Sequence, residues 1–206
     1  GDATVLITGG YTEDADGNRR STPSAELYDP QLGEFIPAPN MNVPRVGHTT
    51  TLLADGSVLL IGGTSERPSA EVYEPSLKRF RPVKETGLTR FHHTASWMSD
   101  GRVLILGGVD ENARTLADIA FFDPATESFS AAGLMRVARV GHTASVLQDG
   151  RVLIVGGNGA DRWALASIEI YDPSADEFSI VFLLSKSRVS HTATTVDAGG
   201  GVLIAG

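Results

Sequence analysis

Four arginines recur along the chain, and each is followed three residues later by a histidine. The pairs are Arg45 with His48, Arg90 with His93, Arg139 with His142, and Arg188 with His191. A guanidinium group carries a planar fork of N–H donors that matches a carboxylate or a phosphate. Arginines at equivalent positions of a repeat could therefore ring one mouth of the molecule and bind an anionic ligand.

Each arginine could instead form a buried ion pair with a glutamate of its own repeat. The candidate glutamates are Glu26, Glu71 and Glu169, with Glu26 reached across a closed ring. The repeat that contains Arg90 carries Ala120 in place of this glutamate, so Arg90 is the arginine most available to a ligand. Both interpretations stay open from the sequence.

A second candidate contact is the run Asp161, Arg162 and Trp163, which lies in a connection between two strand-like segments. Trp and Arg are enriched at the energetic centres of interfaces, which predicts a binding loop here. The alternative is that Trp163 folds back onto its own sheet. Trp97 stands where other repeats carry Leu, Val or Thr, and it is predicted to belong to the core.

The histidines do not predict a metal site. They recur once per repeat instead of converging, and a histidine followed by Thr and small residues is typical of a hydrogen-bonded packing element. Residues 14–18 resemble the start of a calcium loop. However, Ala25 stands where the twelfth-position Glu would be, and a polar turn explains the segment equally well. We predict no metal and no cofactor.

No catalytic arrangement stands out: the sequence suggests neither a Ser-His-Asp set nor a pair of carboxylates, and it contains no cysteine. The formal net charge of −8 offers no electrostatic surface for nucleic acid or an anionic membrane. No apolar run approaches the ~20 residues needed to cross a bilayer. We therefore expect neither a nucleic-acid partner nor insertion into a membrane.

Short strands must position these residues. Residues 141–157 form two apolar-rich runs that are joined at Asp149-Gly150 and end in a double glycine. Asp-Gly between such runs predicts a hairpin, because its turn needs residues that tolerate positive φ. The pattern recurs at 47–63 and 92–108, half of it opens the chain at 5–10, and a near-copy closes it at 190–206.

Each repeat continues with an aromatic-acid-Pro step and a Phe seven residues after the aromatic. The aromatics are Tyr28, Tyr73, Phe122 and Tyr171, and the later residues are Phe35, Phe80, Phe129 and Phe178. Four strands per repeat of about 45–50 residues, without helical periodicity, predict a β-propeller. The connection from the double glycine to the aromatic varies in length, which marks the face that tolerates insertions and often binds.

The order Arg-x-x-His-Thr, Asp-Gly-Arg-Val-Leu-Ile-x-Gly-Gly and Ala-Glu-x-Tyr-Asp-Pro, followed by an aromatic, resembles the kelch repeat. The likeness is greatest to bacterial kelch proteins and the galactose oxidase-like superfamily, and it covers essentially the whole chain. Phe stands where many kelch units carry Trp, and Ala120 is a second departure. The resemblance implies an all-β kelch-type β-propeller of about four four-stranded blades, or part of a six- or seven-bladed ring.

We predict one domain over residues 1–206. Its repeat units span approximately 1–44, 45–89, 90–138 and 139–187, with a closing or partial unit at 188–206. In a closed four-bladed ring, residues 5–7 and 202–204 would compete for one position. Blade strands left unpaired would offer a route to a homo-oligomer.

The resemblance implies a non-catalytic binding scaffold whose loop-bearing face, rimmed by the arginines, recognises a protein, an acidic peptide or another anionic ligand. The alternative is a carbohydrate-active enzyme, since some kelch-type propellers isomerise or oxidise sugars. The Tyr–Cys copper-radical site of galactose oxidase is excluded, because the chain has no cysteine. The compartment stays open, with the resemblance to bacterial kelch proteins favouring an extracellular or periplasmic location.

Overall fold

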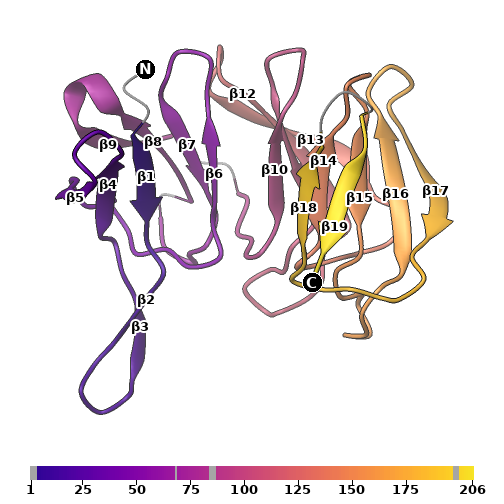
Figure 1. Cartoon of the computed structure of the whole chain (residues 1–206), viewed down its shortest axis with the longest axis horizontal. Helices are drawn as coiled ribbons and strands as arrows, with labels where there is room; N and C mark the ends of the chain where they lie inside the picture. The colour runs from indigo at the N-terminus through magenta and orange to yellow at the C-terminus, as the bar shows by residue number, and fades with distance from the viewer. Residues whose placement is uncertain (1–3, 68, 84–86, 197–199) are drawn as a thin grey trace. The chain divides into compact units, whose positions relative to one another are not determined.

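The computed structural model describes residues 4–67, 69–83, 87–196 and 200–206, and the chain divides into two compact units (Figure 1). Unit 1 comprises Gly1–Phe91 and unit 2 comprises His92–Gly206. Both are built of antiparallel strands, and the only helical segment among the described residues is a 3₁₀ turn, η1 (Pro75–Leu77). The predicted all-β class is confirmed, whereas one propeller domain across the whole chain stays a prediction.

Unit 1 contains a three-stranded sheet, a four-stranded sheet and a hairpin. The sheets have the orders β1-β4-β5 and β6-β7-β8-β9, and β2 pairs with β3 in a hairpin that projects from the rest of the unit (Figure 1). The strands are β1 (Val5–Thr8), β2 (Tyr11–Glu13), β3 (Arg19–Ser21), β4 (Ala25–Asp29), β5 (Glu34–Pro37), β6 (Thr49–Leu52), β7 (Val58–Ile61), β8 (Ala70–Glu74) and β9 (Arg79–Pro82).

Unit 2 contains two four-stranded sheets and a two-stranded one. Their orders are β10-β11-β12-β13, β14-β15-β16-β17 and β18-β19. The strands are β10 (Thr94–Trp97), β11 (Val103–Leu106), β12 (Asp118–Asp123), β13 (Ser128–Leu134), β14 (Thr143–Val146), β15 (Val152–Val155), β16 (Ser167–Asp172), β17 (Glu177–Leu183), β18 (Thr192–Thr195) and β19 (Val202–Ala205).

The repeat landmarks found in the sequence have direct structural causes. Gly56, Gly101 and Gly150 have φ between 84° and 85°, as the predicted Asp-Gly turns require. The seven-residue spacing of the aromatics places them opposite each other on the third and fourth strands, as in the Tyr73–Phe80 pair, whose rings lie 4.9 Å apart. Tilted or offset aromatic pairs of this kind add stability beyond their buried area.

Stacking of neighbouring sheets builds the core of each unit. In unit 1, Leu60, Tyr73 and Phe80 are buried in a cluster that partly buried Leu6 of β1 joins. In unit 2, Leu104 and Leu106 of β11 pack with Val152 and Ile154 of β15. Each sheet has two apolar faces, so it becomes stable only by covering them with its neighbours.

Residues 5–7 and 202–204 each pair with a strand of their own unit, and closure of a ring stays a prediction. β1 pairs with β4, and β19 pairs with β18 within the same two-stranded sheet. Within the described residues, no helix is long and apolar enough to span a bilayer.

Candidate functional site

Two of the four repeat arginines are wholly buried and paired with glutamates. The Arg139 Nη2 atom lies 2.6 Å from Glu169 Oε1, and neither side chain has exposed surface. The Arg139 Nη1 atom also donates to the carbonyl oxygens of Gly156 and Ser167. The second Glu169 oxygen accepts the N–H of Arg136 at 2.8 Å. A buried charge is tolerated when it is paired and hydrogen-bonded in this way.

Arg45 repeats this arrangement in unit 1. Its Nε and Nη2 atoms both donate to Glu71 Oε1, at 3.1 and 2.7 Å, and its Nη1 atom donates to the Gly62 and Ser69 carbonyls. Asn42 donates to the other Glu71 oxygen. For Arg45 and Arg139, the structure therefore contains the ion pair with a glutamate of the same sheet, which was one of the two interpretations left open.

The other two arginines differ in exposure. Arg90 is 3% exposed, and its carbonyl oxygen accepts the N–H of Gly63. Arg188 is half-buried, and its Nη1 atom donates to the carbonyl of Gly206. Glu26, the third candidate glutamate, lies exposed on β4. A ligand-binding role of the four arginines stays a prediction, and three of them offer little or no surface to a ligand.

The repeat histidines join neighbouring sheets. Nε2 of His142, which precedes β14, lies 3.0 Å from Thr94 Oγ1 on β10, and His191 and Thr143 repeat this bond at 3.0 Å. His48 does the same with Thr8 in unit 1. Burial lowers the pKa of His142 to about 3 and that of His48 to about 4, so both are neutral at neutral pH.

The double glycines make this contact possible. A Cβ on Gly107 would lie 2.5 Å from the Arg139 carbonyl oxygen and 3.1 Å from a carbon of the His142 ring, and Gly156 meets Arg188 and His191 in the same way. The arginine, histidine and first glycine together form a packing joint between successive sheets, as predicted for the histidines. Among the described residues, no group of three or more His, Cys, Asp or Glu side chains could hold a metal ion.

Three of the loops that follow the double glycines contain an equivalent turn. Ala113 donates its N–H to the Asp110 carbonyl, Arg162 donates to Gly159, and Gly17 donates to Asp14. Ala113 and Arg162 adopt φ of 58° and 66°, and Gly17 closes the equivalent turn of the β2–β3 hairpin with φ of 81°. Residues 14–18 thus form the polar turn that was one explanation of their sequence.

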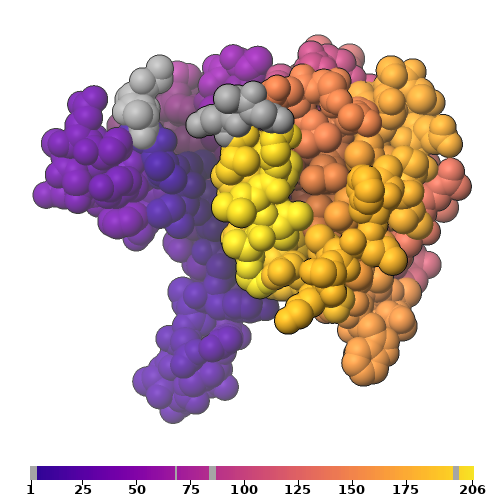
Figure 2. Space-filling view, turned by 45° about the vertical axis from the view of Figure 1, so that its right-hand side comes forward, coloured from indigo at the N-terminus to yellow at the C-terminus, as the bar shows by residue number. Residues whose placement is uncertain are grey.

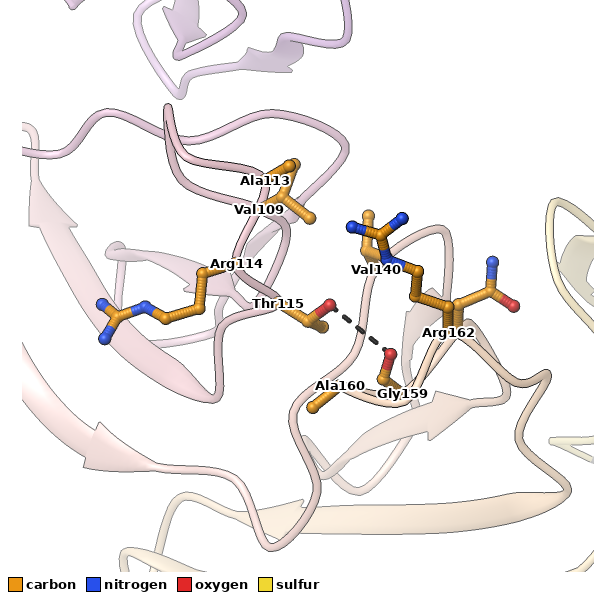
Figure 3. Close-up of a pocket in the computed structure, with 9 residues that line it drawn as sticks. Val109, Ala113, Arg114, Thr115, Val140, Gly159, Ala160 and Arg162 are labelled. Atoms are coloured by element: carbon orange, nitrogen blue, oxygen red, sulfur yellow. Dashed lines mark hydrogen bonds between the residues drawn. The ribbon is translucent and has the colours of Figure 1, made fainter.

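A hollow of about 360 Å³ lies between the two loops of unit 2 (Figure 3). Its walls combine apolar, polar and cationic groups and are formed by Val109, Ala113, Arg114, Thr115, Val140, Asn158, Gly159, Ala160 and Arg162. Thr115 Oγ1 donates to the Gly159 carbonyl at 3.5 Å and connects the two loops. The Arg162 guanidinium extends past Val140 toward the opposite loop, whereas the Arg114 guanidinium points away (Figure 3).

The structure brings Arg162 to this hollow, with Asp161 and Trp163 beside it in the same turn. The Asp161 carboxylate accepts the Trp163 N–H at 3.1 Å. Trp163 is 76% exposed, so it does not fold back onto its sheet. Arg45, Arg90, Arg139 and Arg188 do not line the hollow.

Of the nine residues that line the hollow, the sequence had identified only Arg162; the other eight include Val109, Thr115, Val140 and Asn158. Val109 pairs with Thr115, and Asn158 pairs with both Val140 and Ala164, in isolated bridges. The sequence did contain one indication that the two loops are related, because they have equal length between the double glycine and the aromatic residue. Equal length predicts equivalent turns, but it does not say which side chains face each other.

No protein-family model matches the chain, and no curated protein matches it. Among solved structures, that of a protein named YjhT is similar, with a TM-score of 0.82 over the whole of this chain and 77% of the other. The two sequences are 12% identical, so the likeness concerns the fold alone. It supports an all-β, propeller-like architecture of four-stranded sheets.

Proposed function

We propose that this chain is a non-catalytic binding module on a kelch-type β-propeller scaffold, and that the hollow in unit 2 receives an anionic group of the partner. The observation that carries the proposal is the Arg162 side chain. Among the described residues its guanidinium makes no hydrogen bond and no ion pair, and it extends into the hollow.

Arg114 serves as an internal comparison. It also lines the hollow, but its Nε atom donates to Asp110 at 3.2 Å and its guanidinium points outward. Asp110 therefore already neutralises Arg114. Arg162 is left as the cation of the hollow that an incoming carboxylate or phosphate could pair with.

The backbone of Arg162 has a φ of 66°, and Ala113 has a φ of 58° in the equivalent turn. The positive φ therefore belongs to the turn itself, and Arg162 is the candidate because of where its guanidinium lies and which groups surround it.

The hollow favours a particular class of ligand. About 360 Å³ is near the lower limit of small-molecule sites, so it fits one acidic side chain or a small organic acid. Val109, Val140 and Ala160 supply an apolar wall, and the exposed indole of Trp163 lies in the adjoining turn. An acidic residue next to an apolar one in a peptide or partner protein has this chemistry.

The residues that line the hollow also argue against a catalytic role for it. It contains no His, Asp, Glu, Cys, Lys or Tyr, and so no group that could transfer a proton near neutral pH. Among its polar side chains, Thr115 and Asn158 can donate and accept hydrogen bonds but cannot act as an acid or base. This composition favours binding over the carbohydrate-active alternative.

The test is a calorimetric titration of the protein with short peptides that combine Glu and Leu, and with simple dicarboxylates. Arg162→Gln should weaken binding by about 10-fold or more, because a charge-assisted hydrogen bond contributes roughly 1.5–3 kcal/mol. Arg114→Gln is the matched control and should have little effect. Absence of binding by the wild type, or equal loss from the two variants, would reject the proposal.

A further inference from the structure

Asn158 and Gly159 form the only Asn-Gly pair in the sequence, and both residues line the hollow of unit 2. The side-chain amide of an asparagine can be attacked by the backbone nitrogen of the residue that follows it. The attack is easiest before glycine, because glycine has no Cβ to obstruct the approach. The wall of the hollow therefore contains the asparagine whose neighbour along the chain makes it most reactive.

Backbone hydrogen bonds hold this pair in place in the folded protein. The N–H of Asn158 donates to the Val140 carbonyl at 2.8 Å, and the Asn158 carbonyl accepts the Val140 N–H at 3.0 Å. The Gly159 N–H donates to the Trp163 carbonyl, also at 3.0 Å. The Gly159 nitrogen attacks only after it loses its proton, and a backbone hydrogen bond protects that proton from removal. The reaction therefore requires the bond between Gly159 and Trp163 to open.

The turn that protects the Gly159 nitrogen lies at the surface of unit 2. Residues 160–163 are exposed, and the turn projects from the surface, where it is orange in Figure 2. A second hydrogen bond fixes the turn, since the Asp161 carboxylate accepts the Trp163 N–H at 3.1 Å. Exposed segments with few buried contacts open locally at a much lower free-energy cost than core strands do. The turn can therefore release the Gly159 nitrogen while the sheets of unit 2 stay folded.

We propose that Asn158 is a deamidation site and that opening of the turn 159–163 controls its rate. The Gly159 nitrogen forms a bond to Cγ of Asn158, and the bond from Cγ to Nδ2 breaks. The proton of the Gly159 nitrogen passes through water to Nδ2, which leaves as ammonia, and a cyclic imide remains. Water then opens the imide at either of its two carbonyl carbons. One opening gives aspartate, and the other gives isoaspartate, in which the main chain runs through the side-chain carbon.

Either product inactivates the hollow, a consequence that rests on the proposed function. Deamidation replaces a neutral amide by a carboxylate among the residues that surround the Arg162 guanidinium. That carboxylate competes for Arg162 and repels an incoming anion. Isoaspartate also lengthens the main chain at residue 158, which disrupts the bridges of this residue to Val140 and Ala164. The capacity of the hollow to bind an anionic group therefore declines as the protein ages.

Asn112 in the facing loop provides an internal control. It is more exposed than Asn158, and the residue that follows it is Ala113. The Ala113 N–H donates to the Asp110 carbonyl at 3.0 Å, so its nitrogen is hydrogen-bonded as the Gly159 nitrogen is. The two asparagines differ in the Cβ of the following residue. Asn158 should therefore deamidate faster although it is less exposed.

The test is incubation of the protein in warm, mildly alkaline buffer, followed by peptide mapping with mass spectrometry that separates asparagine, aspartate and isoaspartate. Asn158 should convert on the order of 10-fold faster than Asn112, and Gly159→Ala should remove this difference. The alanine fits, because Gly159 does not have positive φ and the added Cβ meets only the side chains of Asp161 and Leu165, at 3.0 and 3.3 Å or more. Asp161→Ala removes the hydrogen bond to Trp163 and should accelerate conversion about 5-fold.

Conversion at Asn158 no faster than at Asn112, or undiminished in Gly159→Ala, would overturn the deamidation site. An Asp161→Ala variant that converts no faster than the wild type would overturn control by the turn. Circular dichroism confirms that the variants are folded.

The effect on the hollow has a separate measurement. Asn158→Asp carries the charge of the product and should weaken the binding of the Glu- and Leu-containing peptides by about 10-fold. Equal binding by Asn158→Asp and the wild type would overturn the inactivation. A wild type that binds no peptide would reject the proposed function, and inactivation with it, whereas the mass map decides the deamidation site without any ligand.

Discussion

Arg139 and Arg162 lie in the same unit and have the same side chain, but their surroundings are opposite. Arg139 has no exposed surface, and its guanidinium donates to Glu169 and to backbone carbonyls. Arg162 lies on an exposed turn at φ of 66°, with no guanidinium partner among the described residues. The buried arginine stabilises the stacking of sheets, and the exposed one is the residue that we propose binds a ligand. The predictions below test this division.

The largest effect is expected from breaking the buried pair. Arg139→Met should destabilise unit 2 by about 3–5 kcal/mol, because it leaves the Glu169 carboxylate buried without its cation. The measurement is chemical denaturation followed by circular dichroism. The double variant Arg139→Met/Glu169→Leu should recover much of the loss, since it removes both charges. A single variant as stable as the wild type would show that the pair is dispensable.

A smaller loss should follow from filling the glycine joint. Gly107→Ala would place a Cβ 2.5 Å from the Arg139 carbonyl and should cost about 3 kcal/mol through overpacking and positive φ together. Gly101→Ala is the control, because Gly101 also has positive φ but no atom within 4 Å of the added Cβ. It should cost only about 1 kcal/mol. Equal losses of melting temperature would mean that the close approach contributes nothing.

Acid should weaken the same joints. Burial, with Arg139 and His191 nearby, lowers the folded pKa of His142 to about 3. His142 therefore takes up a proton near pH 6.5 in the unfolded chain but not in the folded protein. Its contribution to the free energy of unfolding is complete above pH 6.5 and decreases as the pH falls from 6.5 toward 3. By pH 5 the loss from His142 is on the order of 2 kcal/mol. His142→Gln should flatten this part of the pH profile of thermal unfolding, and an unchanged slope would contradict the assignment.

The smallest effect concerns the loop and has the opposite sign. Arg162→Gly should stabilise the protein by about 1 kcal/mol, because glycine adopts positive φ without strain. Ala113→Gly in the equivalent turn should give a similar gain, whereas Arg162→Ala, which keeps the strain, should give none. Thermal unfolding of the three variants compares them. A destabilised Arg162→Gly would mean that the arginine is structural after all.

Much of the fold could be predicted from residue types and spacing. The Asp-Gly pairs predict hairpin turns, the apolar four-residue runs predict strands buried on both faces, and the seven-residue spacing of Tyr73 and Phe80 matches a cross-strand pair. The sequence also named Glu71 and Glu169 as partners for the arginines. These features depend on neighbours within one sheet, where local geometry determines which residues meet.

The candidate site was only partly predictable. Arg162 and Trp163 were identified by residue type and by their place in a variable loop. Val140 and Asn158 were not, because they reach the hollow through isolated bridges between distant segments. Aromatic and cationic residues are recognisable in a loop, whereas a valine or an asparagine in the wall resembles any other until the chain is folded.

The sequence by itself determined the repeat, its strands and its turns, since two-residue alternation and positive-φ positions are properties of short segments. Only the tertiary structure decided that Arg45 and Arg139 are buried while Arg162 is exposed. The reason is that burial depends on what packs against a side chain. Glu169 lies 30 residues from Arg139 along the chain, and only folding brings it to 2.6 Å.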